Sequence, residues 1–165
     1  MNRYELLTHI RESLASISTP RFFQTERGYQ GALLAQLNNR IPKHVLPKGA
    51  IVEQEYQKSL ARHGLRIRPD IIIHEPFDQS RHADRAEGNI AVIELKLSAS
   101  QAEACDDFKS LAAMIDLLHY PVGIFVNIGA SQTHAGFVQP EMKDRIVSFA
   151  VVLNNGHVQV TQSGT

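Results

Sequence analysis

The sequence predicts a mixed α/β domain: a central sheet flanked by helices, with an N-terminal helix and a C-terminal hairpin. Two observations predict this class. Apolar side chains recur at helical spacing over residues 3–17 and again up to Arg40, after which short β-branched runs begin. A helix-length segment, residues 100–119, then separates the third such run from an almost wholly apolar fourth one, which is the pattern of a crossover unit.

The first forty residues are expected to form two helices. Residues 3–17 carry one apolar stripe, which the Ser-Thr-Pro sequence at 18–20 ends. A second helix capped by Thr19 would run to about Arg40, although its two early glycines favour a start near Thr25.

Three strands are expected next, over residues 50–56, 66–75 and 90–97. Their connections are too short for crossover helices, so the three should form an antiparallel meander. The helix over 100–119 then leads to a strand over 122–128, which should run parallel to the third strand.

The last part of the chain is expected to form a short helix and a hairpin. The helix would cover residues 141–146, and the hairpin strands would cover 146–153 and 157–161. The Asn-Asn-Gly sequence at 154–156 between the strands is a strong hairpin-turn signal.

Composition narrows the class of protein. The 165 residues fit one domain, residues 1–165, with 17 basic and 17 acidic side chains. This balanced charge argues against a large DNA footprint, but not against an enzyme that holds phosphate locally.

The single cysteine, Cys105, allows no internal disulfide and suggests a cytoplasmic location. No signal peptide, membrane span or nucleotide-binding glycine motif is present, so we expect neither membrane association nor a nucleotide cofactor.

The third strand carries the most informative residues. Glu94 and Lys96 interrupt an apolar run and share one face, because side chains alternate along a strand. Charges in a central strand are unfavourable unless they are paired or bound to metal. Asp70, at the start of the neighbouring strand, can approach Glu94 if the two strands pair. The alternative is an ordinary sheet on which Glu94 and Lys96 form a solvated pair.

An acidic pair beside a lysine suits phosphodiester hydrolysis. Adjacent carboxylates raise each other's pKa, and a divalent cation removes that conflict. Mg²⁺ prefers such oxygen ligands, and Mn²⁺ could substitute for it. A bound metal polarises the phosphate and lowers the pKa of a water, while Lys96 could orient that water and stabilise the developing charge.

The residues Pro69-Asp70 and Glu94-Leu95-Lys96 resemble the PD-(D/E)xK motif of the restriction-endonuclease-like nuclease superfamily. The predicted order of elements, α-β-β-β-α-β, is also similar to that family's core. The resemblance implies that Asp70 and Glu94 bind metal and that Lys96 assists catalysis. It also implies a glutamate on the helix before the first strand, for which Glu26 is the candidate, with Gln30 one turn later on the same face.

Three further side chains are candidates for substrate binding. Glu55 could point toward the site or lie on a solvated strand face. Arg68 could contact phosphates or lie at an exposed sheet edge. Lys109 could approach substrate, whereas Asp106 and Asp107 beside it are interpreted as acids that suit the dipole of a first helical turn.

The leading hypothesis is therefore a magnesium-dependent nuclease, a hydrolase whose expected substrate is DNA, with endonuclease and exonuclease activity both open. A chain of this size has little surface for reading a long site, so specificity would need a homodimer or a recognition subunit. The alternative is a catalytically inactive nuclease-fold module that binds nucleic acid or a protein partner. Only the first hypothesis predicts stabilisation by magnesium.

Overall fold

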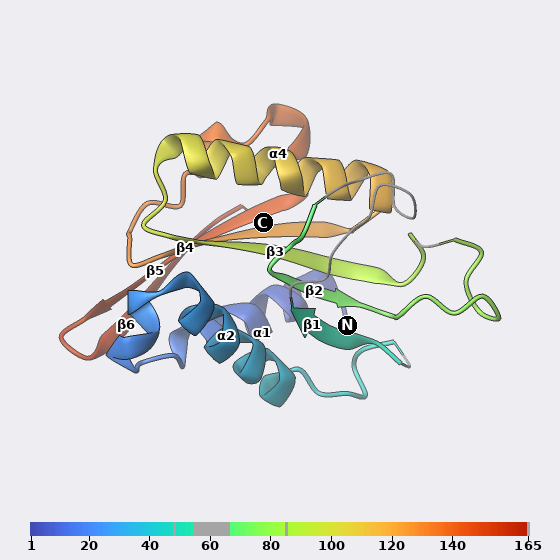
Figure 1. Ribbon diagram of the computed structural model, residues 1–165, viewed down its shortest axis with the longest axis horizontal. Helices are drawn as coiled ribbons and strands as arrows, with labels where there is room; N and C mark the ends of the chain where they lie inside the picture. The colour runs from blue at the N-terminus through green and yellow to red at the C-terminus, as the bar shows by residue number, and fades with distance from the viewer. Residues whose placement is uncertain (48, 55–66, 85, 165) are drawn as a thin grey trace.

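The computed structural model describes residues 1–47, 49–54, 67–84 and 86–164 (Figure 1). Within them, six strands form one mixed sheet in chain order. The pairs β1–β2, β2–β3 and β5–β6 are antiparallel, and β3–β4 and β4–β5 are parallel. The strands are β1 (Ile51–Gln54), β2 (Ile71–His74), β3 (Asn89–Leu97), β4 (Val122–Ile128), β5 (Ile146–Asn154) and β6 (His157–Ser163).

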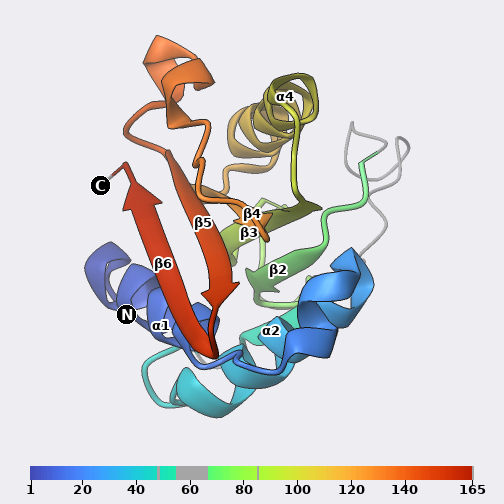
Figure 2. The same ribbon diagram turned by 90° about the vertical axis from the view of Figure 1, so that its left-hand side faces the viewer.

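Helices cover both faces of this sheet. α1 (Arg3–Ala15) and α2 (Glu26–Arg40) lie on one face, and α4 (Gln101–Leu118) lies on the other (Figure 2). The core is accordingly divided in two by the sheet. Because side chains alternate along a strand, Ile93 faces α1 and α2, whereas Val92 faces α4. This is the predicted restriction-endonuclease-like order, with an N-terminal helix and a C-terminal hairpin.

The predicted crossover and hairpin are both confirmed. β3, α4 and β4 form a parallel crossover unit, in which Glu94 pairs with Phe125 in the strand register. The turn between β5 and β6 places Asn155 at φ 48° and Gly156 at φ 80°. Two successive positive φ values are what a tight two-residue hairpin requires, and Asn-Gly adopts them most readily.

Of the two starts expected for the second helix, the later one near Thr25 is confirmed. Thr19 precedes a short 3₁₀ helix, η1 (Pro20–Gln24), and the long helix begins at Glu26. The reason is that Thr25 takes an extended backbone and its hydroxyl accepts a hydrogen bond from Gly28 N, so Thr25 is the N-cap of α2.

The prediction of a short helix over 141–146 is wrong. The structure has 3₁₀ turns at η2 (Ala135–Phe137) and η3 (Pro140–Met142), and β5 already begins at Ile146. Only three residues separate η3 from that strand, which is too few for an α-helix.

The meander is confirmed, but its second strand is shorter than predicted. The expected start near residue 66 lies outside the described residues, and β2 begins only at Ile71. Pro69 has no N–H to donate to the ladder, which explains why pairing does not extend back through it. None of the helices in the described segments is both long and apolar enough to cross a membrane.

Candidate active site

The site lies just before the first residue of β2, where β3 continues beyond its last residue paired with β2. Ile71, the first residue of β2, pairs with Ile93, so the N–H groups of Leu95 and Leu97 on the same side of β3 have no strand partner there. Two carboxylates accept hydrogen bonds from these N–H groups in place of a strand partner. Asp70 Oδ2 accepts a hydrogen bond from Leu95 N at 2.7 Å, and Glu26 Oε2 accepts one from Leu97 N at 3.3 Å.

Asp70 and Glu94 lie together on the face of the sheet that α4 covers. Asp70 is two residues before Ile72, and Glu94 is two residues after Val92, and both apolar residues belong to the α4-side core. The two carboxyl groups share a hydrogen bond. The geometry predicted for this pair is therefore present.

Burial makes this acidic pair electrostatically unfavourable. The Glu94 side chain is buried, and burial, followed by the charges of Asp70 and Asp107, raises its pKa well above the ordinary value. Burial also raises the pKa of Asp70, although the Leu95 N–H partly opposes this shift. Without a cation, the pair therefore holds a proton up to a higher pH than an exposed carboxyl group would.

Lys96 lies on the same face and approaches the acids. Its Nζ is 3.8 Å from Glu26 Oε2, at the first turn of α2. Burial by itself would lower the pKa of Lys96, but the surrounding carboxylates, with Asp107 first and Glu26 next, raise it overall. The lysine is thus held as an ammonium among acids.

Gln30, one turn after Glu26 on α2, contacts the site through the backbone. Its buried amide Nε2 donates to the carbonyl oxygen of Asp70 at 2.7 Å. This hydrogen bond fixes the segment that carries the Asp70 carboxylate, so Gln30 positions an acid here.

Asp107 belongs to this group, and the helix-dipole interpretation of it is wrong. α4 begins at Gln101, its N-cap is Ser100, and the acid of its first turn is Glu103. Asp107 lies beyond that turn, at helical spacing from the buried residues Ala104 and Leu111, and so turns toward the sheet. That spacing was a signal in the sequence that Asp107 faces the sheet, although it does not show which strand residues lie opposite.

The environment of Asp107 is unusual for an acid. Burial raises its pKa to about 6, a shift that the charge of Lys96 partly offsets. Its Oδ2 atom is buried and accepts no hydrogen bond from the described residues. A carboxylate oxygen in this state is unfavourable unless another positive group compensates it.

The other candidates are placed differently. Lys109 forms an ion pair with Asp106 at 2.8 Å, and both side chains are mostly exposed. Lys109 lies two residues after Asp107, and at this spacing on a helix the two side chains point in different directions. Arg68 is exposed just before Pro69, and Glu55 lies outside the described residues.

The residues fit a hard divalent cation held with several waters. No three His, Cys, Asp or Glu side chains in the described segments already form a metal-ligand arrangement. Mg²⁺, however, usually binds through only one or two carboxylates and keeps the rest of its shell as water. Asp70 and Glu94 supply that pair, and the unpartnered oxygen of Asp107 adds negative charge nearby.

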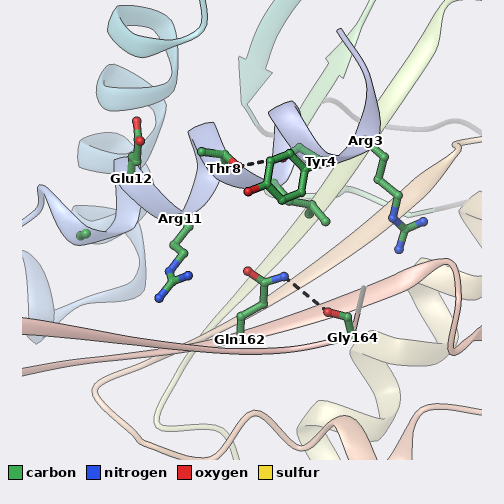
Figure 3. Close-up of a pocket in the computed structure, with 9 residues that line it drawn as sticks. Arg3, Tyr4, Thr8, Arg11, Glu12, Gln162 and Gly164 are labelled. Atoms are coloured by element: carbon green, nitrogen blue, oxygen red, sulfur yellow. Dashed lines mark hydrogen bonds between the residues drawn. The ribbon is translucent and has the colours of Figure 1, made fainter.

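A separate groove lies between α1 and β6 and has a volume of about 780 Å³ (Figure 3). Arg3, Tyr4 and Arg11 line it from the helix, and Gln162 lines it from the strand. It shares no residue with the acidic group on the other face of the sheet, so the groove and the acidic group are distinct features of the molecule.

The strand order, with an acidic pair and a lysine on one face of β2–β3, defines a restriction-endonuclease-like fold. No family model and no curated protein sequence matches the chain. Solved structures do match it. One is NucC of P. aeruginosa ATCC27853 in its cAAA-bound form, with a TM-score of 0.50 and 13% identity, covering 99% of this chain and 85% of that one. Another is NucC of E. coli MS115-1, also cAAA-bound, with a TM-score of 0.51 and 13% identity, covering 99% and 84%. At this identity the likeness shows the fold.

Proposed function

We propose that this protein is a metal-dependent nuclease that hydrolyses phosphodiester bonds of nucleic acid, with DNA as its substrate. The observation that supports this most is the contact between the Asp70 and Glu94 carboxyls beside Lys96. A purely structural sheet gains nothing from this arrangement, because two buried acids in contact destabilise it.

Each residue has a proposed role in this reaction. Asp70 and Glu94 hold Mg²⁺, for which Mn²⁺ can substitute. A bound metal of this kind polarises a phosphate and makes a water more acidic. Lys96 orients the attacking water through its ammonium group and stabilises the negative charge that develops on the phosphate oxygens.

Glu26 and Gln30 support the site from α2. Glu26 restrains the Lys96 ammonium at 3.8 Å and accepts the hydrogen bond of Leu97 N. Gln30 holds the Asp70 backbone. Both act from the first two turns of one helix, so a single packed element sets the position of an acid and an amine.

The proposal also concerns location and partners. The lone Cys105 fits the reducing cytoplasm. The balanced charge of the chain indicates that it reads little DNA by itself, so a homodimer or a recognition subunit supplies any sequence specificity.

Purified protein tests the proposal directly. Supercoiled plasmid, linear DNA and single-stranded RNA are incubated with the protein in Mg²⁺, in Mn²⁺ and in EDTA. Cleavage of DNA is expected only with metal, and Asp70→Asn and Lys96→Ala should abolish it while remaining folded. Lys143→Ala, which removes an exposed lysine outside the site, is the matched control and should cleave normally.

Two results would contradict the proposal. Cleavage that persists in both site variants would indicate a contaminating nuclease. Absence of cleavage in the parent protein, together with a melting temperature that Mg²⁺ does not change, would favour the non-catalytic module instead.

A further inference from the structure

The strand β6 forms one edge of the sheet, and its outer side is open. Among residues 1–47, 49–54, 67–84 and 86–164, β6 pairs only with β5, so one row of its backbone N–H and C=O groups has no strand partner. Val158 and Val160 pack toward the core on the α1 side, while Gln159 and Thr161 are exposed on the other face. An open row of this kind is a template on which another strand can form hydrogen bonds.

The features with which soluble proteins protect such an edge are missing from β6. Charged side chains, prolines, bulges and short strands normally discourage pairing with another chain. The other edge of the described sheet follows this rule, because β1 has only four residues and carries Glu53, which forms an ion pair with His74 at 3.0 Å. In contrast, β6 has seven residues, its register with β5 runs without a shift, and positions 158–163 contain neither a charge nor a proline. This contrast indicates that the β6 edge is an interface.

The groove beside β6 extends the same surface. It lies between α1 and β6 and has a volume of about 780 Å³ (Figure 3). Tyr4 on its helix wall is 80% exposed, and Gln162 of β6 forms part of its strand wall. An exposed aromatic side chain next to an unprotected strand edge is typical of a surface that contacts another protein.

A second copy of this chain fits this surface. When β6 pairs antiparallel with itself, the two valines meet the same apolar face of the partner, and Gln159 and Thr161 meet uncharged polar side chains. Positions 158–163 bring no like charges together, and the whole chain has a formal net charge of zero. The helix wall of the groove carries both signs, with Arg11 next to Glu12, so two copies of it do not repel as surfaces of one sign would.

We propose that β6 pairs antiparallel with β6 of a second copy about a two-fold axis, so that two sheets join into one. This pairing names the partner that the proposed function left open. It stands without the nuclease chemistry, and only its consequence for cleavage rests on the proposed function.

The consequence concerns the positions of the two acidic sites. The axis is perpendicular to the sheet, so both Asp70–Glu94 pairs lie on the same face of the joined sheet. Because β3 is three strand spacings from β6, the two copies of β3 are separated by seven spacings, or about 34 Å, close to one turn of B-DNA. A two-fold dimer of this kind presents one site to each of the two antiparallel strands of a duplex.

The first test is the oligomeric state, measured by light scattering during gel filtration over a range of concentrations. The parent protein is expected at twice the chain mass of 18.4 kDa. Thr161→Lys adds a charge on the exposed face of β6 and should raise the dimer Kd at least about tenfold, because it brings like charges together across the axis. Ala35→Lys, the matched control, adds the same charge at an exposed position of α2 and should remain dimeric. Both variants should keep the circular dichroism spectrum of the parent.

Cysteine cross-linking tests the geometry of the pairing. In a Cys105→Ser background, Gln159→Cys and Thr161→Cys are oxidised separately and as a mixture. Residues directly opposite each other in an antiparallel pair have Cα atoms about 4.5–5.5 Å apart, a separation that a disulfide spans. With the axis at the middle of the strand, at residue 159, 160 or 161, one of the three samples should give a covalent dimer. Ala35→Cys in the same background should give none.

Each contrary result overturns the inference. A parent protein that stays monomeric at every concentration would assign the edge to a different partner chain. A dimer that Thr161→Lys does not weaken, or that no cysteine sample cross-links, would use another surface.

Neither readout requires cleavage, so the two proposals can fail separately. An inactive parent protein would reject the nuclease function and leave a β6 dimer standing. In an active parent, Thr161→Lys should lower the ratio of linear to nicked plasmid, because single-site copies cut one strand at a time. An unchanged ratio would overturn the placement of the two sites on one duplex.

Discussion

The buried acids of the site predict that the metal-free protein becomes more stable when the pH falls from 7.5 to 5.0. Asp70, Glu94 and Asp107 all have folded-state pKa values above their ordinary values. The folded state therefore binds protons more tightly than the unfolded state, so stability is gained as the pH falls through the folded pKa. The relevant window for Asp107 runs from about pH 7 down to its ordinary value near 4.

The magnitude follows from the Asp107 pKa, which rises from 3.8 to about 6. Between pH 7.5 and 5.0, this shift corresponds to about 1.4 kcal/mol of added stability by proton linkage. Because the side chain is partly exposed and its charge is screened, about half of this, or about 0.7 kcal/mol, is a realistic expectation. For a chain of this length that is a rise of about 2 °C in melting temperature from Asp107 alone.

The assay is thermal unfolding followed by circular dichroism in EDTA at pH 7.5, 6.0 and 5.0. Asp107→Asn lacks the titrating group, so its melting temperature should gain about 2 °C less than the parent's over this range. Subtracting the two curves cancels the contribution of the titrating side chains that do not interact with Asp107, so the difference reports Asp107 together with its effect on Glu94. Asp106→Asn should keep the parent's response. Identical pH responses of the parent and Asp107→Asn would refute the reasoning.

Three further predictions concern the same site and its scaffold. Mg²⁺ at about 100 times its Kd should add about 2.7 kcal/mol of stability, visible as a melting shift that EDTA reverses and Asp70→Asn lacks. Gln30→Ala should lose about 1–3 kcal/mol in urea unfolding, because the partly buried Asp70 carbonyl loses its amide donor at 2.7 Å, and a loss below about 0.3 kcal/mol would contradict this. Ser100→Ala, which removes the capping box of α4, should cost about 1 kcal/mol, and unchanged stability in the same assay would show that the cap is dispensable.

Rules that involve only residues near one another in the sequence are sufficient to predict the motif itself. Strand alternation alone places Glu94 and Lys96 on one face, and the fold has them there. Short connections predict the meander, and the helix-length crossover predicts that β4 runs parallel to β3. These features depend on periodicity and connection length, which are properties of neighbouring residues.

Predictions that depend on where an element starts are weaker. The end of the long second helix at Arg40 is predicted correctly, but the sequence leaves two starts open, because Thr19 and Thr25 are both good caps. The early glycines favour the later start, and the structure has it, with Thr25 as the N-cap. The start of β2 likewise follows from Pro69 and the carboxylate of Asp70, since a side-chain acceptor replaces the next backbone partner.

The sequence by itself determined the class of fold, the acidic pair and its lysine, because each follows from the spacing of residues within one element or between adjacent strands. Only the tertiary structure decided that Asp107 joins them and that Lys109 turns to the surface. The periodicity of α4 showed which residues face a core. It could not show that the charged part of that face lies over Lys96, because the position of a helix across a sheet is set by packing between residues distant in the chain.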